Sequence, residues 1–470
     1  MLRLRTSIVL PLALCAVAQG CSDEPASNAD ASAVTDLGAA DAGTDTGPTD
    51  TGPTDTGPVD SGRADTGVDA GFDAGFDAGF DAGQDSGADA GADAITDALT
   101  DAGPACALTR ALVTTSDYVT GGYALGPLAT PALMTVGGMA PDQDHVPVQS
   151  GCVVYNLLRG NDVLAVLDAA SLPNVLRTIP LRSMLSVDAG AAPYQVNPYD
   201  VLTLSPTRAY VAQFQLSRLA IINPAATGAA AITGSIDLSP LRDAADVDPS
   251  GSPEAVQLLR SGARVFVLLQ NLSSYAPVAD GVLGVIDPAT DALVDVDTAT
   301  AGTQGVGLGV RNPAAATLTP SGARIVVAGA GAVAFAPPQS LDGAVVAVDT
   351  TTLTTTGGRV TEAQLGGDVA GVVMHSDTAG WAVVNTLDAD GGAPTARVVA
   401  FDLAGSTVGA TVYTSTSIGG VARAPDGNVW VLDRGATTAG VRVFRPDGTE
   451  VTTGALSTGS LPPSGVAFVP

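Results

Sequence analysis

The chain has 470 residues, of which 46% are hydrophobic and only 4% aromatic, so it can bury a substantial core. Its formal net charge is −28, and all 20 of its basic residues are arginines. The lack of lysine excludes a lysine-dependent phosphate loop or Schiff base, and the acidic balance argues against nucleic acid as a partner.

Residues 1–20 have the pattern of an export signal. Arg3 and Arg5 give a positive start, an apolar run covers residues 7–18, and small residues follow. The apolar run is too short to span a membrane. We therefore expect residues 1–20 to be a signal peptide, with an uncut segment of the core as the alternative.

The end of this segment, AQGC (18–21), resembles a bacterial lipobox. The resemblance implies that Cys21 is lipidated and becomes the new N-terminus. Ala18 departs from the leucine that is usual at its position, which leaves plain secretion as the alternative. Cys15 is a rival acceptor, but the bulky Leu14 precedes it where a small residue is needed.

Residues 22–103 differ in composition from the rest of the chain. They hold nineteen carboxylates and one arginine, a net charge of −18, which leaves −12 for residues 104–470 once Arg3 and Arg5 are removed. TDTGP recurs at a spacing of five residues and FDAG at a spacing of four. Glycine and aspartate favour turns, and like charges keep such a chain open.

The aspartates of this segment do not have the spacing of a calcium site. A calcium loop needs carboxylates at alternate positions and a closing glutamate, and a calcium-binding solenoid needs an apolar residue in each turn. We therefore expect residues 21–103 to form a disordered tether. Weak and unspecific calcium accumulation is the alternative. As a flexible coil, roughly 80 residues span on the order of 50 Å.

Four cysteines are present, and the first two have been accounted for. Cys15 leaves with the signal peptide and Cys21 takes the lipid, so Cys106 and Cys152 remain. Two thiols in an oxidising compartment predict one disulfide. The alternative is two buried free cysteines.

Residues 104–470 are expected to be all-β. Short valine-rich runs alternate with turns that contain glycine, proline, asparagine or aspartate. One pattern returns: an apolar strand, a turn, a second strand that opens on a bulky residue, a loop, and a third strand that ends in aspartate or asparagine. Its copies begin at residues 200, 254, 315, 370 and 419, and a looser copy covers residues 152–179. The spacing of roughly 45 to 65 residues suits propeller blades.

The two ends of residues 104–470 complete each other. PPSGVAFVP (462–470) matches only the first strand of the repeat, and residues 109–127 match its second and third strands. A lone inner strand with bare edges is unstable, so the two ends should pair in one composite blade that closes the ring. This predicts a β-propeller of seven four-stranded blades, with six or eight as the alternatives. A disulfide between Cys106 and Cys152 would tie the composite blade to the next blade.

Large side chains recur at one position of the repeat. Tyr210, Phe266, Trp381 and Trp430 fall in one column, and Val326 is its aliphatic member. A shared buried position between blades is the simplest explanation. Both tryptophans are therefore expected in the core.

The repeats resemble those of bacterial propellers of the YVTN and NHL type. PDGNVWVLD (425–433) followed by VFRPDG is similar to the NHL pattern, and VIDPATDALV (285–294) is similar to the YVTN pattern. These motifs are structural. The family includes protein-binding scaffolds, surface proteins and enzymes such as lactonases and lyases, so the resemblance implies a fold without choosing an activity.

Sequence motifs for catalysis are sparse. With only His145 and His375 in the chain, a centre with several histidine ligands is excluded. HSD (375–377) contains three residue types of a catalytic triad, but neighbouring residues point to different faces, and the motif matches a turn of the repeat. GVGLGV (305–310) lacks the strand-to-helix context of a dinucleotide site and is expected to be a loop.

Carboxylates provide the remaining candidates. DADGG (388–392) has the spacing of a small calcium loop but is expected to be a solvated turn. Asp200 and Glu254 are expected to begin the inner strands of successive blades, where two carboxylates can face the central channel and hold a divalent cation. Lactonase-like propellers use acidic and amide ligands there, but no third ligand can be matched in this chain. Solvated strand ends are the alternative.

The sequence therefore predicts a lipoprotein of the bacterial cell envelope, held at the outer membrane or cell surface by Cys21. Its propeller is expected to bind a protein or glycan without catalysis, as a monomer and without a cofactor. The alternative is a metal-dependent hydrolase or lyase of the lactonase-like type, and a purely structural envelope protein is a third possibility.

Overall fold

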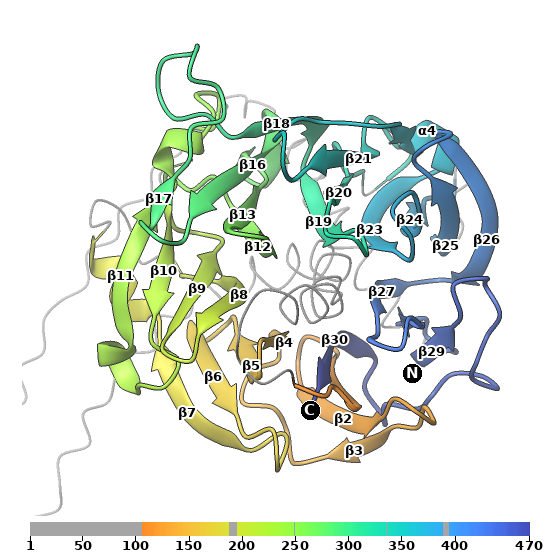
Figure 1. The fold of residues 1–470 in the computed structure, drawn as a ribbon. Coiled ribbons are helices and arrows are strands. Elements are labelled where there is room, and N and C mark those ends of the chain that lie inside the picture. Colours follow the sequence, from red (N-terminus) through yellow and green to blue (C-terminus); the bar gives the residue numbers. More distant parts are fainter. Residues whose placement is uncertain (1–105, 188–194, 249, 335, 389–393) are drawn as a thin grey trace, which may run out of the picture. The chain divides into compact units, whose positions relative to one another are not determined.

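The computed structural model describes residues 106–187, 195–248, 250–334, 336–388 and 394–470 (Figure 1). The expected signal peptide, Cys21 and the expected tether lie outside these ranges. No helix in the described ranges is long and apolar enough to cross a membrane.

Seven antiparallel sheets form a ring of blades around a central axis in the described residues (Figure 1). The strands of each blade follow one another from the axis outward. Blade 1 is β30 (Pro463–Val469), β1 (Arg110–Ser116), β2 (Gly121–Pro127) and β3 (Met134–Val136). Blade 2 is β4 (His145–Ser150), β5 (Val153–Leu158), β6 (Val163–Leu167) and β7 (Val175–Pro180). Blade 3 is β8 (Pro198–Ser205), β9 (Arg208–Gln213), β10 (Arg218–Ile222) and β11 (Ile232–Asp237).

The remaining blades follow in chain order. Blade 4 is β12 (Ala255–Ser261), β13 (Arg264–Leu269), β16 (Asp280–Asp287) and β17 (Ala292–Leu293), and β18 (Val306–Arg311) also pairs with β16. Blade 5 is β19 (Pro313–Leu318), β20 (Arg324–Gly329), β21 (Ala344–Asp349) and β22 (Val360–Thr361). Blade 6 is β23 (Asp368–Met374), β24 (Ala379–Thr386), β25 (Thr395–Asp402) and β26 (Thr407–Ser415). Blade 7 is β27 (Ile418–Arg423), β28 (Val429–Asp433) and β29 (Gly440–Phe444).

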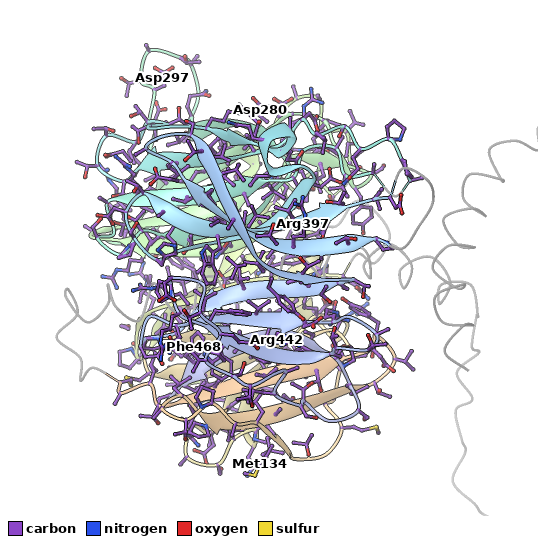
Figure 2. All side chains as sticks on the ribbon, turned by 90° about the vertical axis from the view of Figure 1, so that its right-hand side faces the viewer. Met134, Asp280, Asp297, Arg397, Arg442 and Phe468 are labelled. Atoms are coloured by element: carbon purple, nitrogen blue, oxygen red, sulfur yellow. A yellow bond between two sulfur atoms is a disulfide. The ribbon has the colours of Figure 1, made fainter. Side chains whose placement is uncertain are left out.

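Short elements decorate this ring. A small hairpin, β14 (Leu272–Ser273) and β15 (Ala276–Pro277), extends from blade 4. The helices are η2 (Arg182–Val187), η3 (Gly228–Ala231), η4 (Ser239–Leu241) and α4 (Glu362–Leu365). Figure 2 shows the ring from its edge, with Met134 of β3 and the exposed Asp297 of the β17–β18 loop at opposite sides.

The prediction of seven blades and of a composite blade is confirmed. β1 pairs with β30 over six residue pairs from Arg110 and Val469 to Thr115 and Pro463. The first and last strands of the described body thus lie side by side, and the inner edge of β1 is covered. The prediction of four strands in every blade is wrong for blade 7, whose outer segment makes only isolated bridges with β29.

The core lies between blades. Alternate side chains of one strand face opposite neighbours: Val466 and Phe468 of β30 pack against blade 7, whereas Ala467 and Val469 pack against blade 2. Six apolar clusters in the described residues fill the gaps between neighbouring blades around the ring. Strands that are buried on both faces read as continuous apolar runs, which explains the valine-rich segments.

The column of large side chains is buried as predicted. Tyr210, Phe266, Val326, Trp381 and Trp430 are each at most 1% exposed. Tyr155 occupies the same position of β5 and is also fully buried. The sequence interpretation missed this member because its looser copy of the repeat began at residue 152, whereas blade 2 begins with its inner strand β4. β4 contains Pro147, a residue that argues against a strand.

Six of the seven inner strands carry a β-bulge near their start. The extra residues include Tyr199 in β8, Val256 in β12 and Ala314 in β19, and β23, β27 and β30 are irregular at the matching place. A bulge sharpens the local twist and changes the direction of a side chain. The bulges therefore decide which residues of the inner strands face the neighbouring blade.

The ring has two unlike faces. We call the side with the loops that precede the inner strands, and with the loops that join second to third strands, the loop face. The opposite side, with the tight connections between first and second strands, is the turn face. Residues 151–152 connect β4 to β5 on the turn face, and residues 270–279 connect β13 to β16 on the loop face.

Arginines at the first position of second strands join blades on the turn face. Arg110 donates from Nη2 to the carbonyl of Ala169 in blade 2 at 2.5 Å. Arg208 pairs with Asp291 of blade 4, and Arg264 donates to the carbonyl of Thr350 in blade 5 at 3.1 Å. The repeated arginine is thus a clamp between blades.

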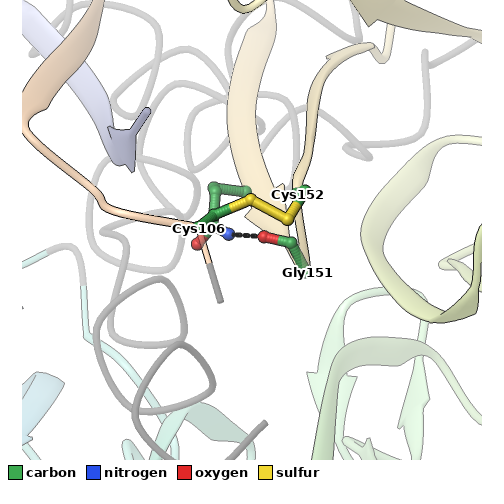
Figure 3. The surroundings of a disulfide bond; sticks show 4 residues. Cys106, Gly151 and Cys152 are labelled. Carbon is green, nitrogen blue, oxygen red and sulfur yellow. Dashed lines mark hydrogen bonds between the residues drawn. A yellow bond between two sulfur atoms is a disulfide. The ribbon is translucent and has the colours of Figure 1, made fainter. Parts of the chain in front are cut away.

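The predicted disulfide between Cys106 and Cys152 is present (Figure 3). The two Cα atoms are 5.6 Å apart, and 46 positions separate the residues in sequence. Cys106 precedes β1 of blade 1, and Cys152 lies in the β4–β5 connection of blade 2. The bond fixes the start of the described chain to the turn face.

Loss of this disulfide should destabilise the propeller. The chain-entropy model gives about 4 kcal/mol as an upper figure for a loop of this length. We expect the double variant Cys106→Ser, Cys152→Ser to unfold at lower urea concentration than the wild type. A reductant should lower the wild-type midpoint and leave that of the double variant unchanged. Equal midpoints for oxidised and reduced wild type would contradict a stabilising role.

One segment differs from its predicted state. GVGLGV was expected to be a loop, but residues 306–311 form β18, which pairs with β16. Val306, Leu308 and Val310 are buried while the residues between them are exposed. This strict alternation is typical of a half-buried strand. The sequence interpretation did not recognise it because glycines occupy two of the exposed positions.

Candidate functional site

The two carboxylates predicted at the channel do not occupy equivalent positions. Asp200 is the third residue of β8 and follows the bulge, whereas Glu254 immediately precedes β12. By register, Asp200 corresponds to Gln257 of β12, and Glu254 corresponds to Asn197 of blade 3. The sequence alignment of the two blades was therefore offset by three residues.

Asp200 connects two neighbouring inner strands by a hydrogen bond. The side chain is 5% exposed, and its Oδ2 accepts a hydrogen bond from the N–H of Leu258 in blade 4 at 2.7 Å. Gln257 makes the corresponding link between blades 4 and 5. Its side-chain oxygen accepts from the N–H of Ala316, and its side-chain NH2 group donates to the carbonyl of Ala316. Ser150 of blade 2 accepts from the N–H of Thr203 in blade 3. A series of side chains thus links blades 2, 3, 4 and 5.

Removal of the Asp200 carboxylate should lower stability. Asp200→Ala leaves the buried N–H of Leu258 without its acceptor, which costs about 1–3 kcal/mol. Asp200→Asn keeps an oxygen acceptor and should lose less. Urea unfolding of the two variants measures the difference. If Asp200→Ala unfolds at the wild-type midpoint, the contact with Leu258 does not stabilise the ring.

Glu254 is buried in an unusual backbone conformation. Its φ of +51° lies in the left-handed region, where a glutamate is uncommon. Asn197 and Asn312 have φ values of +50° and +46° at the same position of blades 3 and 5. In all three blades the carbonyl of this residue accepts an N–H from the segment after the second strand, for example from Phe214 to Asn197 at 2.9 Å. The left-handed residue before the inner strand is thus a feature of the fold that recurs in blades 3, 4 and 5.

The Glu254 side chain is protonated at neutral pH. Burial raises its pKa to about 9, and the carboxylates of Asp246 and Asp248 add to the rise. The N–H of Leu272, which donates to Oε2 at 2.7 Å, and Arg242 act in the opposite direction. A neutral carboxylic acid can donate a proton in a hydrogen bond, which a carboxylate cannot do.

The loop before β12 surrounds this acid. Arg242 donates from Nε to Asp246 at 2.7 Å and from Nη2 to the carbonyl of Asp248 at 2.8 Å. The Asp248 carboxylate accepts from the N–H of Ser274 and from the hydroxyl of Ser273. These contacts fix the hairpin β14–β15 to the loop.

The hairpin presents a tyrosine. Its two-residue turn is Ser274 and Tyr275, with φ values of +50° and +62°. Such turns favour asparagine and glycine, and a left-handed tyrosine is an outlier. Strained residues of this kind are concentrated at functional sites. Tyr275 is also one of the exposed large hydrophobic side chains in the described chain, although its exposed fraction of 37% is the lowest among them.

Tyr275 belongs to a stack of aromatic rings that crosses from blade 4 to blade 3. Its ring centroid is 6.3 Å from that of Phe214 with 14° between the planes, and Phe214 is 4.7 Å from Tyr199 with 22°. The guanidinium of Arg159 lies 3.7 Å from the centroid of Tyr199 at the other end. We call these four residues the aromatic stack.

Arg159 anchors the stack from blade 2. Its side chain is fully buried, its Nε donates to Asn197 at 3.0 Å, and its Nη1 lies 3.6 Å from Asp144. A buried guanidinium needs such partners because its charge has left water. The stack is therefore rigid at its inner end and exposed at Tyr275.

The two histidines have structural surroundings. His145 is 1% exposed, and burial lowers its pKa to about 4. Its ring contacts the carbonyl of Thr115 and the amide of Asn156. His375 packs edge-on against Trp381, while Asp377 accepts from the N–H of Ser321 in blade 5. The HSD motif thus forms the predicted turn, with its side chains engaged separately.

A metal centre is not evident among the described residues. No group of three or more histidine, cysteine, aspartate or glutamate side chains there is close enough to hold an ion. Most of the DADGG motif lies outside the described residues. The candidate site is therefore the loop face of blades 3 and 4, with Glu254 and the aromatic stack. Sequence reasoning found Glu254 and missed the stack, whose members are far apart in sequence and come from three blades.

The fold resembles known propellers. A candidate 6-phosphogluconolactonase from Bacteroides uniformis has a TM-score of 0.51 and 14% identity, over 77% of this chain and 99% of that one. A candidate 6-phosphogluconolactonase from Bacteroides fragilis gives 0.48 and 13%, over 77% and 98%. The Swd1 propeller domain of Myceliophteria thermophila gives 0.44 and 10%, over 69% and 93%.

The similarity to these structures extends to the fold alone. Identities this low do not carry an activity across. No protein-family model matches the chain, and no curated protein matches its sequence.

Proposed function

We propose that the protein is a lipoprotein of the bacterial cell envelope that displays a non-catalytic propeller for binding a protein or glycan ligand. Residues 1–20 act as the signal peptide, Cys21 carries the lipid, and residues 21–103 form the tether. The lipid bilayer is then one partner, and the ligand of the loop face is the other. The protein acts as a monomer at the outer membrane or cell surface.

The position of the disulfide supports a display role. Cys106 is fixed to Cys152 on the turn face, so the tether joins the propeller on that side. The loop face lies at the opposite ends of the same strands. In the proposed arrangement, the ligand site is on the face opposite to the point where the tether joins the propeller.

The surroundings of the acidic residues favour binding over catalysis. Asp200 accepts N–H groups from Val201 and Leu258, and Glu254 accepts one from Leu272. Their carboxyl groups therefore have roles within the fold. Tyr275 is exposed on the loop face, and aromatic side chains of this kind are enriched at binding surfaces.

Metal analysis and a hydrolase assay test this proposal against the lactonase-like alternative. The full-length protein is purified from its native membrane and analysed for bound metal and for hydrolysis of a panel of lactones. Asp200→Asn and Glu254→Gln are compared with Asp297→Asn, which removes an exposed carboxylate from an outer loop. We expect no stoichiometric metal and no hydrolysis.

A stoichiometric ion that is lost with activity in Asp200→Asn or Glu254→Gln, but kept in Asp297→Asn, would contradict the proposal. The protein would then be a metal-dependent hydrolase or lyase. Asp200 and Glu254 would be its first candidate ligands.

A further inference from the structure

Two basic side chains share the gap between blades 6 and 7 at its turn-face end. The inner strands β23 and β27 of these blades lie next to each other (Figure 1). Val373 of β23 and Val421 of β27 both pack into the apolar cluster that fills the gap. His375 and Arg423 each lie two residues further along the chain, and alternate residues of an extended segment face the same side. Both side chains are therefore directed into this gap, where its apolar core ends.

Arg423 is a half-buried cation without a close counter-ion. Its Nε is buried and has no hydrogen-bond partner in the described part of the chain, and its guanidinium takes part in none of the ion pairs found there. Burial lowers its pKa, and the carboxylate of Asp426 acts in the opposite direction. Asp426 is exposed, and its two oxygens accept from the N–H and the side-chain amide of Asn428 at 3.0 and 2.8 Å. A guanidinium that has partly left water needs a partner, so Arg423 keeps donors for an anion from outside the chain.

His375 is the second basic group of this gap. Its ring packs edge-on against Trp381, a member of the same apolar cluster, with 5.9 Å between the ring centroids. Burial lowers the pKa of His375, and the charge of Arg423 lowers it further. Asp377, two residues along, accepts from the N–H of Ser321 in blade 5 at 3.0 Å. The nearby carboxylates of both turns thus have partners of their own, whereas the two basic groups repel each other.

We infer that His375 and Arg423 bind a phosphate group at the turn face, between blades 6 and 7. The planar guanidinium can donate two parallel hydrogen bonds to two phosphate oxygens, and an imidazole N–H can donate to a third. The site lies on the face opposite to the proposed ligand surface, so the inference goes beyond the proposed function and does not depend on it. Residues 104–470 carry a formal charge of −12, which does not attract anions from a distance. Recognition therefore depends on the contacts within the gap.

Nuclear magnetic resonance of the untagged full-length protein with ¹³C-labelled histidine tests the inference. The chain contains two histidines, and His145 is only 1% exposed, so its signal is an internal reference. Inorganic phosphate is titrated at a constant ionic strength of about 0.15 M, which screens exposed charges. We expect a saturable shift of the His375 signal alone. The pKa of His375 should rise on binding, because a neighbouring anion favours the charged imidazolium.

Two variants with a matched control separate this site from diffuse charge. Arg423→Gln should weaken phosphate binding about tenfold or more, since hydrogen bonds from a charged group are lost. Without phosphate it should raise the pKa of His375, because a neighbouring cation is removed, and this shift also reports that the variant is folded. Arg423→Lys keeps the charge but lacks the planar fork, so it should bind more weakly than the wild type. Arg445→Gln removes an exposed arginine from the turn face of the same blade and should match the wild type in both measurements.

Two further probes identify the anion. Monomeric dihexanoyl-phosphatidylglycerol represents a lipid headgroup, and acetate represents a carboxylate. Tighter binding of the lipid than of inorganic phosphate would assign the site to a headgroup, and the reverse would assign it to a free phosphate compound. Both results support a phosphate site, whereas tighter binding of acetate would overturn it.

An unchanged His375 signal in the wild type would also overturn the inference. Equal losses of affinity in Arg423→Gln and Arg445→Gln would do the same, because they would show diffuse attraction in place of a site. Metal-dependent hydrolysis of lactones would contradict the proposed function and leave this inference unaffected. The two failures are thus distinguishable.

Discussion

Deletion of residues 462–470 should prevent the ring from closing and leave no cooperative folded state. This segment supplies β30, in which Val466, Phe468 and Val469 are fully buried. Burial of three such side chains contributes about 6 kcal/mol, which is comparable with the whole stability of many domains. The deletion also bares the inner edge of β1. Circular dichroism during heating should show no sharp transition.

A circular permutant is the matched control for this deletion. The N–H of Thr109 donates to the carbonyl of Val469 at 2.9 Å, so the two ends of the propeller can be joined by a short linker. New ends can be placed in the exposed loop of residues 297–302. The permutant should melt cooperatively near the wild-type temperature. A cooperative transition in the deletion variant would contradict the closing role of β30.

Stability should fall as pH rises, and Glu254 should account for much of the fall. Its pKa is about 9 in the folded protein, against an ordinary value of 4.5. Above pH 4.5 the unfolded chain releases this proton while the folded chain keeps it. The free energy of unfolding therefore decreases by about 1.4 kcal/mol per pH unit until the pH reaches about 9. Between pH 5 and pH 8.5 the decrease is roughly 5 kcal/mol.

Glu254→Gln removes this decrease, because glutamine is neutral in both states and its oxygen can still accept from Leu272. Glu362→Gln is the control. The Glu362 carboxyl accepts from the N–H groups of Gly343 and Val369, and burial raises its pKa to about 7. Its variant should flatten the profile only below pH 7. Urea unfolding at a series of pH values measures both. A Glu254→Gln profile as steep as that of the wild type would show that Glu254 is ionised.

The ring could be predicted because each blade repeats a recognisable sequence pattern. Strands that pack between two blades need apolar residues on both faces, and the column from Tyr210 to Trp430 marked the register. The incomplete repeats at the two ends predicted the composite blade. The disulfide was predicted because two cysteines remain after the expected signal peptide and lipid site, and because the expected compartment is oxidising.

The candidate site was less predictable, for physical reasons. Its aromatic stack joins Arg159, Tyr199, Phe214 and Tyr275, which come from three blades, and no periodic pattern links them. The turn at Tyr275 lacks the glycine or asparagine that normally reveals a tight hairpin.

The bulges also lay beyond sequence reasoning. A bulge adds one residue and shifts the register of an inner strand, but no sequence pattern marks its position. For this reason Asp200 was aligned with Glu254 when its structural counterpart is Gln257.

Mass spectrometry of the protein from its native membrane tests the central claim most directly. The sample is digested without reduction, and the N-terminal peptide is identified. We predict that the mature chain begins at a lipid-modified Cys21 and that Cys106 remains linked to Cys152. An unmodified Cys21, or a chain that still carries residues 1–20, would contradict a lipid-anchored propeller.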